Sequence, residues 1–251
     1  GFWSWIDGAL FLPEVWFGNS HEKLRQRLGV PPEMSFKTKV ELAWELIERA
    51  LAADLPFDLV GFDCLYGRSS ELRAQVRQAG KLYMAEVPAD TQVYLDKPLL
   101  GVPPRQSQRG RKPSAIQVLA GEAVRVDSLR EQLPWHAVQV RATDRGELCD
   151  PFAARRVWTV HAGEAVEDWR VMREEADGKH SYALCNASRE TSLEQLAWGK
   201  CQRYFIERAN QDAKSELGWD ELQAQKYRAW EHHLALTVLA SWFVAQTKYE
   251  W

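Results

Sequence analysis

Apolar residues recur at steps of three and four from Thr191 to Gly218, which is the spacing of one face of an α-helix. Thr191 and Glu194 stand three positions apart, as in a capping box, and Gly218 suits the left-handed turn that ends many helices. The pattern therefore predicts one long, half-buried helix between these ends. The apolar stripe consists of Leu193, Leu196, Ala197, Cys201, Tyr204, Phe205, Ala209 and Ala213.

Two more segments carry the helical pattern. Thr38 and Glu41 have capping-box spacing, and the apolar stripe behind them predicts a helix through about Ala53. A stripe of aromatic and aliphatic residues predicts a second long helix from Tyr227 to Tyr249. The chain is thus expected to end in a pair of long helices.

Short apolar runs predict strands in the first third of the chain. The run from Leu59 to Phe62 is typical of a buried strand, and a short helix capped by Ser69 or Ser70 follows it. Residues 81–90 have the composition of another strand. The pattern also predicts a strand from Phe2 to Ile6 and an irregular loop over residues 14–37.

From residue 91 onward the character of the chain changes to short β-prone runs separated by Gly, Pro and Asp. We expect three segments: a first core part over residues 1–90, a mostly β segment over 91–190, and C-terminal helices over 191–251. Residues 97–114 are rich in Pro and basic, with no acid. This basic loop is either a solvated linker or a segment that follows a phosphate backbone and becomes ordered on DNA. Its cations are Lys97, Arg105, Arg109, Arg111 and Lys112.

The overall composition is that of a globular protein. The net charge of −3 means that any contact with nucleic acid must come from local basic patches. The four cysteines are far apart and have no zinc-site spacing, which indicates free thiols in a reducing compartment. No apolar run is long enough to span a membrane, so we expect no membrane partner.

Charged residues stand at regular offsets on the helix predicted over 191–218. Arg203, Glu207 and Lys214 are four and seven positions apart, which places them on nearly the same face. One interpretation is a solvated salt bridge between residues one turn apart; the other is a carboxylate flanked by two phosphate-binding cations. Asp63 is a second candidate, because a carboxylate at the carboxyl end of a buried strand lies where open α/β sheets bind ligands. Its alternative role is to cap the turn that follows.

These residues resemble motifs of a known family. The arrangement of Arg, three residues, Glu, six residues and Lys is similar to the R-E-K part of the Y-R-E-K signature of bacterial insertion-sequence transposases of the DDE class. The stretch F-D-C-L-Y-G-R at 62–68 resembles that family's D-x-x-Y-G-R stretch. The resemblance implies an α/β fold with an RNase H-like mixed sheet, interrupted by a mostly β insertion and completed by the helix pair.

The resemblance also implies roles for particular residues. Asp63 and Glu207 would be the second and third catalytic, metal-binding carboxylates, and Mg²⁺ or Mn²⁺ the cofactor. The cations would contact DNA at the transposon ends and the target, and the protein would act as a homodimer in a synaptic complex, in the bacterial cytoplasm at the nucleoid. Lys200 occupies the Tyr position of the signature and is counted among these cations. The expected DNA-binding residues are Arg203, Lys214, Lys200, Arg105, Arg109, Arg111 and Lys112.

The family's first Asp has no match in the chain. Asp7 is the acid nearest the start, but its W-I-D-G-A-L context does not resemble the first-Asp motif, so no catalytic role is carried onto it. We therefore expect an N-terminally truncated catalytic domain that is inactive alone. Two other hypotheses stay open: a non-catalytic remnant that binds DNA or another subunit, and an RNase H-like nuclease unrelated to transposition.

Overall fold

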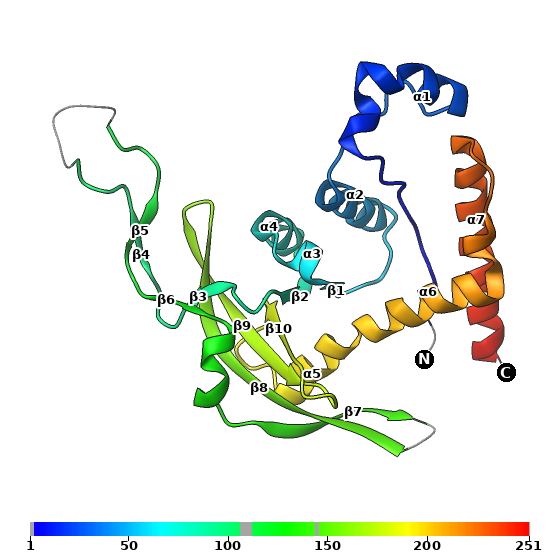
Figure 1. The fold of residues 1–251 in the computed structure, drawn as a ribbon. Coiled ribbons are helices and arrows are strands. Elements are labelled where there is room, and N and C mark those ends of the chain that lie inside the picture. Colours follow the sequence, from blue (N-terminus) through cyan, green and yellow to red (C-terminus); the bar gives the residue numbers. More distant parts are fainter. Residues whose placement is uncertain (1–2, 106–111, 144–145, 251) are drawn as a thin grey trace. The chain divides into compact units, whose positions relative to one another are not determined.

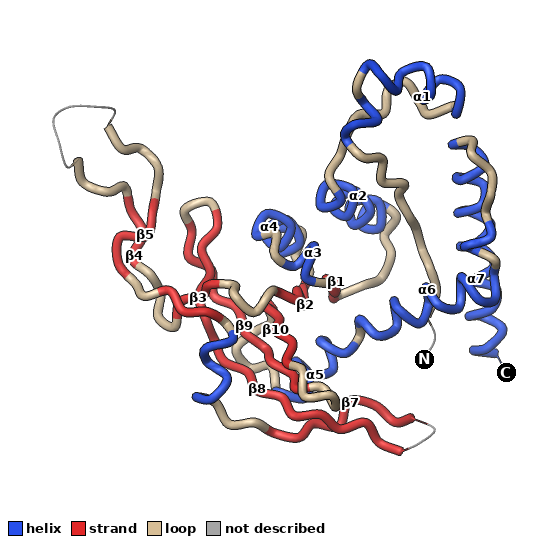
Figure 2. The backbone as a smooth tube through the Cα atoms, in the orientation of Figure 1, coloured by secondary structure: helices blue, strands red, loops and turns tan. Residues whose placement is uncertain are grey.

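The computed structural model describes residues 3–105, 112–143 and 146–250, which form two compact units. The sheet unit is Pro56–Gln202, and the helical unit combines Gly1–Leu55 with Arg203–Trp251. Figure 1 shows the course of the chain, and Figure 2 shows that strands dominate the sheet unit while helices dominate the other.

A mixed sheet forms the centre of the sheet unit. Its strands run in the order β1-β2-β10-β9-β8-β3-β6, with β7 paired to β8, while β4 and β5 form a separate two-stranded sheet. β1 and β2 are parallel, with Leu59 opposite Leu82, and the other pairs are antiparallel. The strands are β1 (Leu59–Phe62), β2 (Leu82–Val87), β3 (Gln92–Tyr94), β4 (Leu99–Gly101), β5 (Gln117–Ala120), β6 (Ala123–Arg125), β7 (His136–Thr143), β8 (Gly146–His161), β9 (Glu164–Glu174) and β10 (His180–Cys185).

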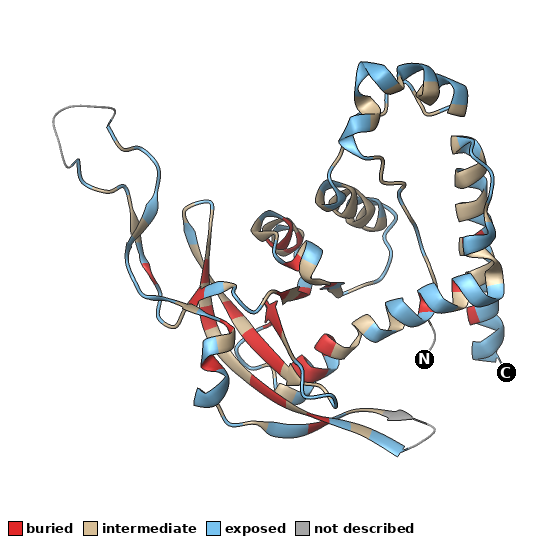
Figure 3. Ribbon diagram, viewed as in Figure 1, coloured by how far each residue is buried: buried red, intermediate tan, exposed pale blue. Residues whose placement is uncertain are grey.

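Helices cover both faces of this sheet. Successive strand residues point to opposite faces, so Tyr83 and Met84 of β2 separate the two sides. The Tyr83 hydroxyl accepts a hydrogen bond from Arg77 of α4, whereas Met84 packs with Leu196 of α5. Figure 3 shows that buried residues gather on the central strands and on parts of α4 and α5. The helices of this unit are α3 (Cys64–Gly67), α4 (Ser70–Gln78) and α5 (Leu193–Cys201), with a 3₁₀ helix at Asp127–Gln132.

The helical unit is built around two long C-terminal helices and the extended N-terminal segment. Trp3 donates from its indole nitrogen to Asp212 of α6, and the backbone nitrogen of Trp5 donates to the hydroxyl of Ser241 in α7. The α-helices of this unit are α1 (Glu22–Leu28), α2 (Lys39–Ala52), α6 (Arg203–Leu217) and α7 (Tyr227–Glu250). Short 3₁₀ helices lie at Glu14–Phe17, Asn19–His21 and Trp219–Glu221.

The predicted fold class is confirmed: the protein is α/β, with a mixed sheet of the kind expected for an RNase H-like fold and a long C-terminal helix pair. Local signals were also correct in several places. Thr38 and Glu41 form the predicted capping box of α2, and Ser69 caps α4 by accepting a hydrogen bond from the Leu72 backbone. The strand predicted over Leu59–Phe62 and the helix beginning at Tyr227 are present.

Three predictions of local structure were wrong. The helix predicted between Thr191 and Gly218 is broken at Gln202 into α5 and α6, and its capping box is formed by Ser192 and Gln195, one position later than predicted. Residues 3–13 form no strand, because their polar groups contact the helices α6 and α7 and no neighbouring strand. Phe2 lies outside the described residues. The loop predicted over residues 14–37 contains α1, which ends at Gly29 in the left-handed conformation.

Candidate functional site

Asp63 lies where the parallel strand β1 ends and helix α3 begins. Its Oδ1 accepts hydrogen bonds from the backbone nitrogens of Leu65 at 2.8 Å and Tyr66 at 3.2 Å. Its Oδ2 makes no hydrogen bond with any residue that the structure describes. The carboxylate therefore caps α3 with one oxygen, which is the alternative role considered for Asp63, and metal binding by it stays a prediction. Its negative charge adds to the effect of burial, the larger cause, in raising the pKa of Tyr66.

Glu207 and Arg203 form an ion pair on the first turns of α6, with 2.9 Å between Oε1 and the guanidinium. The Glu207 side chain is 58% exposed. This is the contact that the salt-bridge interpretation requires, and it leaves most of the carboxylate accessible to a further ligand. Lys214 lies on the same helix and is exposed. Glu207 belongs to the helical unit and Asp63 to the sheet unit, so the proximity of their carboxylates stays a prediction.

Lys200 is buried inside the sheet unit. Its side chain is 1% exposed, and its Nζ lies 3.3 Å from Oε1 of Glu86, 114 positions away in the sequence. Burial lowers the pKa of Lys200, and the charge of Glu86 opposes that effect. In this position the ammonium group of Lys200 pairs with Glu86 inside the protein and is not exposed for contact with a DNA backbone.

The basic loop is described only in part. Arg105 and Lys112 are exposed on the two sides of the loop, next to the small sheet formed by β4 and β5. Arg109 and Arg111 lie outside the described residues. The described part thus presents two of the predicted cations to solvent.

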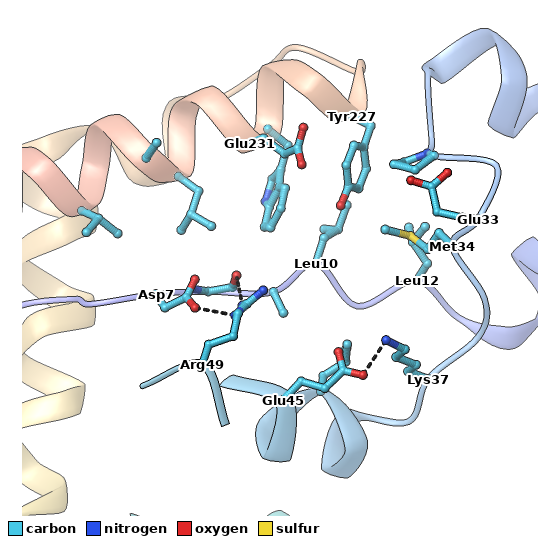
Figure 4. Close-up of a pocket in the computed structure, with 18 of the residues that line it drawn as sticks. Asp7, Leu10, Leu12, Glu33, Met34, Lys37, Glu45, Arg49, Tyr227 and Glu231 are labelled. Carbon is cyan, nitrogen blue, oxygen red and sulfur yellow. Dashed lines mark hydrogen bonds and ion pairs between the residues drawn. The ribbon is translucent and has the colours of Figure 1, made fainter. Parts of the chain in front are cut away.

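Asp7 lies at a cavity of about 850 Å³ in the helical unit, between the N-terminal segment, α2 and α7 (Figure 4). Its Oδ2 pairs with Arg49 at 2.8 Å, and Glu45 in the same cavity pairs with Lys37 at 2.5 Å. Among the described residues no group of three or more His, Cys, Asp or Glu side chains is arranged to hold a metal ion. Asp7 therefore has a structural partner, and no catalytic role is assigned to it.

A hard divalent ion fits the donor at Asp63. Mg²⁺ and Mn²⁺ prefer oxygen ligands, and Mg²⁺ is bound in proteins through one or two carboxylates together with water and substrate phosphates. Asp63 provides an oriented carboxylate with one oxygen unused by the described residues. Glu86, which sequence reasoning did not single out, is a second carboxylate near this edge of the sheet. The available signal was a Glu inside an otherwise apolar strand, L-Y-M-A-E-V.

None of the helices within residues 3–105, 112–143 and 146–250 combines the length and the apolar character needed to cross a membrane. No curated protein matches the sequence. A family model described as "DDE superfamily endonuclease" matches residues 2–147, more than half of the chain. The matched part contains Asp63 and Glu86 and ends before α6. The chain therefore belongs to the DDE superfamily endonucleases.

Proposed function

We propose that this chain is part of the catalytic domain of a DDE transposase, which cleaves DNA at transposon ends and transfers the strands to a target. Asp63 and Glu207 are its second and third acids, and both hold Mg²⁺ or Mn²⁺. The observation that carries the proposal is the place of Asp63 in the region matched by the family model. It stands at the carboxyl end of a parallel strand, with one oxygen oriented by the start of α3.

The ion would supply Lewis-acid stabilisation of the charge that develops on the phosphate oxygens. The protein's own contribution is placement. Asp63 is held by two backbone N–H groups, so its orientation changes little when substrate binds. Arg203 presents a planar guanidinium next to Glu207, and Lys214 presents a point charge farther along α6. These two cations would grip neighbouring phosphates.

The DNA partner follows from the family, and the cations define where it would lie. Arg203 and Lys214 would contact transposon-end DNA, and the basic loop with Arg105 and Lys112 would follow a second stretch of backbone. We propose that two copies of the protein act together on the paired ends. Lys200 is left out of the DNA-binding set because its ammonium group is buried against Glu86.

One observation favours a second candidate function. The ion pair between Arg203 and Glu207 is an i,i+4 contact within α6, of the kind that a purely structural helix makes on its surface. A chain with this role would bind DNA without cleaving it. Metal dependence separates the two functions, because only the catalytic one requires Asp63 and Glu207 to act on the same phosphate.

The test is cleavage of a supercoiled plasmid that carries the transposon ends, in Mg²⁺ and in Mn²⁺. Only two of the three family acids are assigned here, so we expect the 251 residues alone to leave the plasmid uncut. The assay is therefore repeated with the chain joined to any in-frame segment that its locus encodes upstream. Cleavage gained in this way should be lost in Asp63→Asn and Glu207→Gln. It should persist in Glu216→Gln, a matched control at an exposed acid of the same helix. Cleavage that survives Glu207→Gln would contradict the proposal.

A further inference from the structure

Glu86 and Asp63 are neighbours at the carboxyl edge of the parallel pair β1–β2. Phe62 lies opposite Ala85 in the strand register, so the next residue of each strand is Asp63 on one side and Glu86 on the other. Neighbouring strands are about 4.8 Å apart. The register therefore brings two carboxylate-bearing residues to the same edge of the sheet.

Helix α3 supports this placement independently of the register. The backbone nitrogen of Gly67, the last residue of α3, donates to the carbonyl oxygen of Asp63 at 2.7 Å. A Cβ on Gly67 would overlap the carbonyl oxygen of Glu86. The single turn that Asp63 caps is thus seated directly on the backbone of Glu86, and only glycine fits at the contact.

Strand alternation places Glu86 on the face of β2 that α5 covers, and Asp63 follows the end of the neighbouring strand. Register partners in a parallel pair share a face, and Met84, opposite Gly61, packs with Leu196 of α5. Two positions farther along β2, Glu86 returns to this α5 side, while Asp63 turns its carboxylate onto the start of α3. Lys200, the next-to-last residue of α5, reaches Glu86 from the same side.

The two side chains of the pair formed by Lys200 and Glu86 are buried to different extents. The lysine side chain is 1% exposed, whereas the glutamate side chain is 18% exposed at the edge of the sheet. A buried ion pair stabilises a fold no better than apolar residues of similar volume do, because both charges lose their hydration. Stability alone therefore gives no reason to keep a buried cation under this carboxylate, whereas orientation of the carboxylate gives one.

We propose that Glu86 is a further carboxylate of the metal site, giving an oxygen to the ion that Asp63 binds, and that Lys200 is the residue that positions it. The inference rests on the proposed function, which supplies the divalent ion. Lys200 fixes one oxygen of Glu86 and offsets the repulsion between two adjacent acids before the ion arrives. This assigns a role to the residue that stands at the signature's Tyr position.

The experiment measures Mn²⁺ binding by the whole 251-residue chain, without DNA, from the electron paramagnetic resonance signal of free Mn²⁺. Asp63→Asn should abolish binding at this site, and Glu86→Gln should weaken it about tenfold or more. Lys200→Met should weaken it by a smaller factor, because Glu86 is still present but no longer held. Glu122→Gln is the matched control, an exposed acid of the same unit, and should bind as the unaltered chain does.

The double variant Glu86→Gln with Lys200→Met separates positioning from folding, because it removes both charges of the pair together. Lys200 acts only through Glu86, so the double variant should bind Mn²⁺ as weakly as Glu86→Gln alone. If the double variant loses as much Mn²⁺ affinity as the two single variants together, the positioning role of Lys200 is overturned. Unchanged binding in Glu86→Gln, with loss in Asp63→Asn, would overturn the role of Glu86 and leave the proposed function intact. Unchanged binding in Asp63→Asn would contradict the proposed function itself.

Discussion

Removing one partner of the pair between Lys200 and Glu86 should cost very different amounts of stability, depending on which partner is removed. Glu86→Gln leaves an ammonium group that is 1% exposed without a carboxylate. Lys200→Met leaves a carboxylate that is 18% exposed and that water can solvate, while methionine fills the volume of the lysine stem. We expect Glu86→Gln to lower the free energy of unfolding by about 3–5 kcal/mol, and Lys200→Met by less than about 1.5 kcal/mol.

The larger loss should also depend on pH in a defined direction. Burial already lowers the pKa of Lys200 from its ordinary 10.5, and without Glu86 that pKa falls further. The unfolded chain then binds a proton that the folded chain lacks between the two pKa values, so stability rises with pH across that window. The penalty is complete below the folded pKa and disappears near 10.5. The difference in unfolding free energy between the unaltered chain and Glu86→Gln should therefore shrink as pH rises from 7 to 10.

Urea unfolding, followed by circular dichroism and by tryptophan fluorescence, measures both quantities. The slope with urea should stay the same, so that the shift in midpoint reports stability. Glu122→Gln serves as the control and should change the free energy by less than about 0.5 kcal/mol. Equal losses in Glu86→Gln and Lys200→Met, or a difference that does not change with pH, would refute the account of a buried cation held by an edge carboxylate.

Three further predictions concern other parts of the chain. Arg203→Ala and Lys214→Ala should each weaken binding to transposon-end DNA and reduce the slope of log affinity against log salt by about one. Arg208→Ala is the control and should leave that slope unchanged, because the Arg208 guanidinium already pairs with Asp212 at 3.1 Å. An unchanged slope in the first two variants would mean that Arg203 and Lys214 make contacts only within the helix. Cys149 is exposed, whereas Cys185 is buried and its pKa is raised to about 11. A thiol reagent at pH 8 should therefore label Cys149 at least about a hundredfold faster than Cys185. Peptide mapping by mass spectrometry measures both labelling rates, and equal rates would contradict the burial of Cys185. Asp168→Asn should lower the free energy of unfolding by about 2–3 kcal/mol, because the buried carboxylate accepts hydrogen bonds from Arg77, Tyr83 and Thr159. Urea titration measures this free energy. An unchanged value would mean that the three donors find other partners.

The elements that the sequence predicted correctly carry their signals within a few residues. Thr38 and Glu41 cap α2 by mutual hydrogen bonds across one turn. Leu59–Phe62 forms a strand whose end at Asp63 was visible from the apolar run alone. Such features need no information from distant parts of the chain, and a local pattern is sufficient for them.

The failures near residue 200 have a nonlocal cause. Gly199 lies against the side chains of Leu59 and Met84, and Lys200 finds its partner 114 positions away in β2. From the local pattern alone, the apolar stripe and Lys200 predict a single amphipathic helix with a solvated cation. The burial of Lys200 depends on this contact with the sheet, which the sequence of the helix does not encode.

The loop predicted over residues 14–37 is a different kind of failure, because its signal was present. Glu22–Leu28 is followed by Gly29 in the left-handed conformation, the usual end of a helix. For the candidate site, the sequence indicated Asp63 and Glu207 through motif spacing. It did not indicate Glu86, whose proximity to Asp63 depends on which strands are paired and in which register.

A crystal structure of the protein with Mn²⁺ would show whether Asp63 and Glu207 bind the same metal centre, as proposed. The anomalous scattering of manganese locates the ions. We expect a manganese peak within about 2.0–2.4 Å of a carboxylate oxygen of Asp63, with an oxygen of Glu207 on the same ion or on a second ion about 3.5–4 Å away. Asp63 and Glu207 on opposite sides of the protein, with manganese on neither or on only one of them, would contradict the proposal.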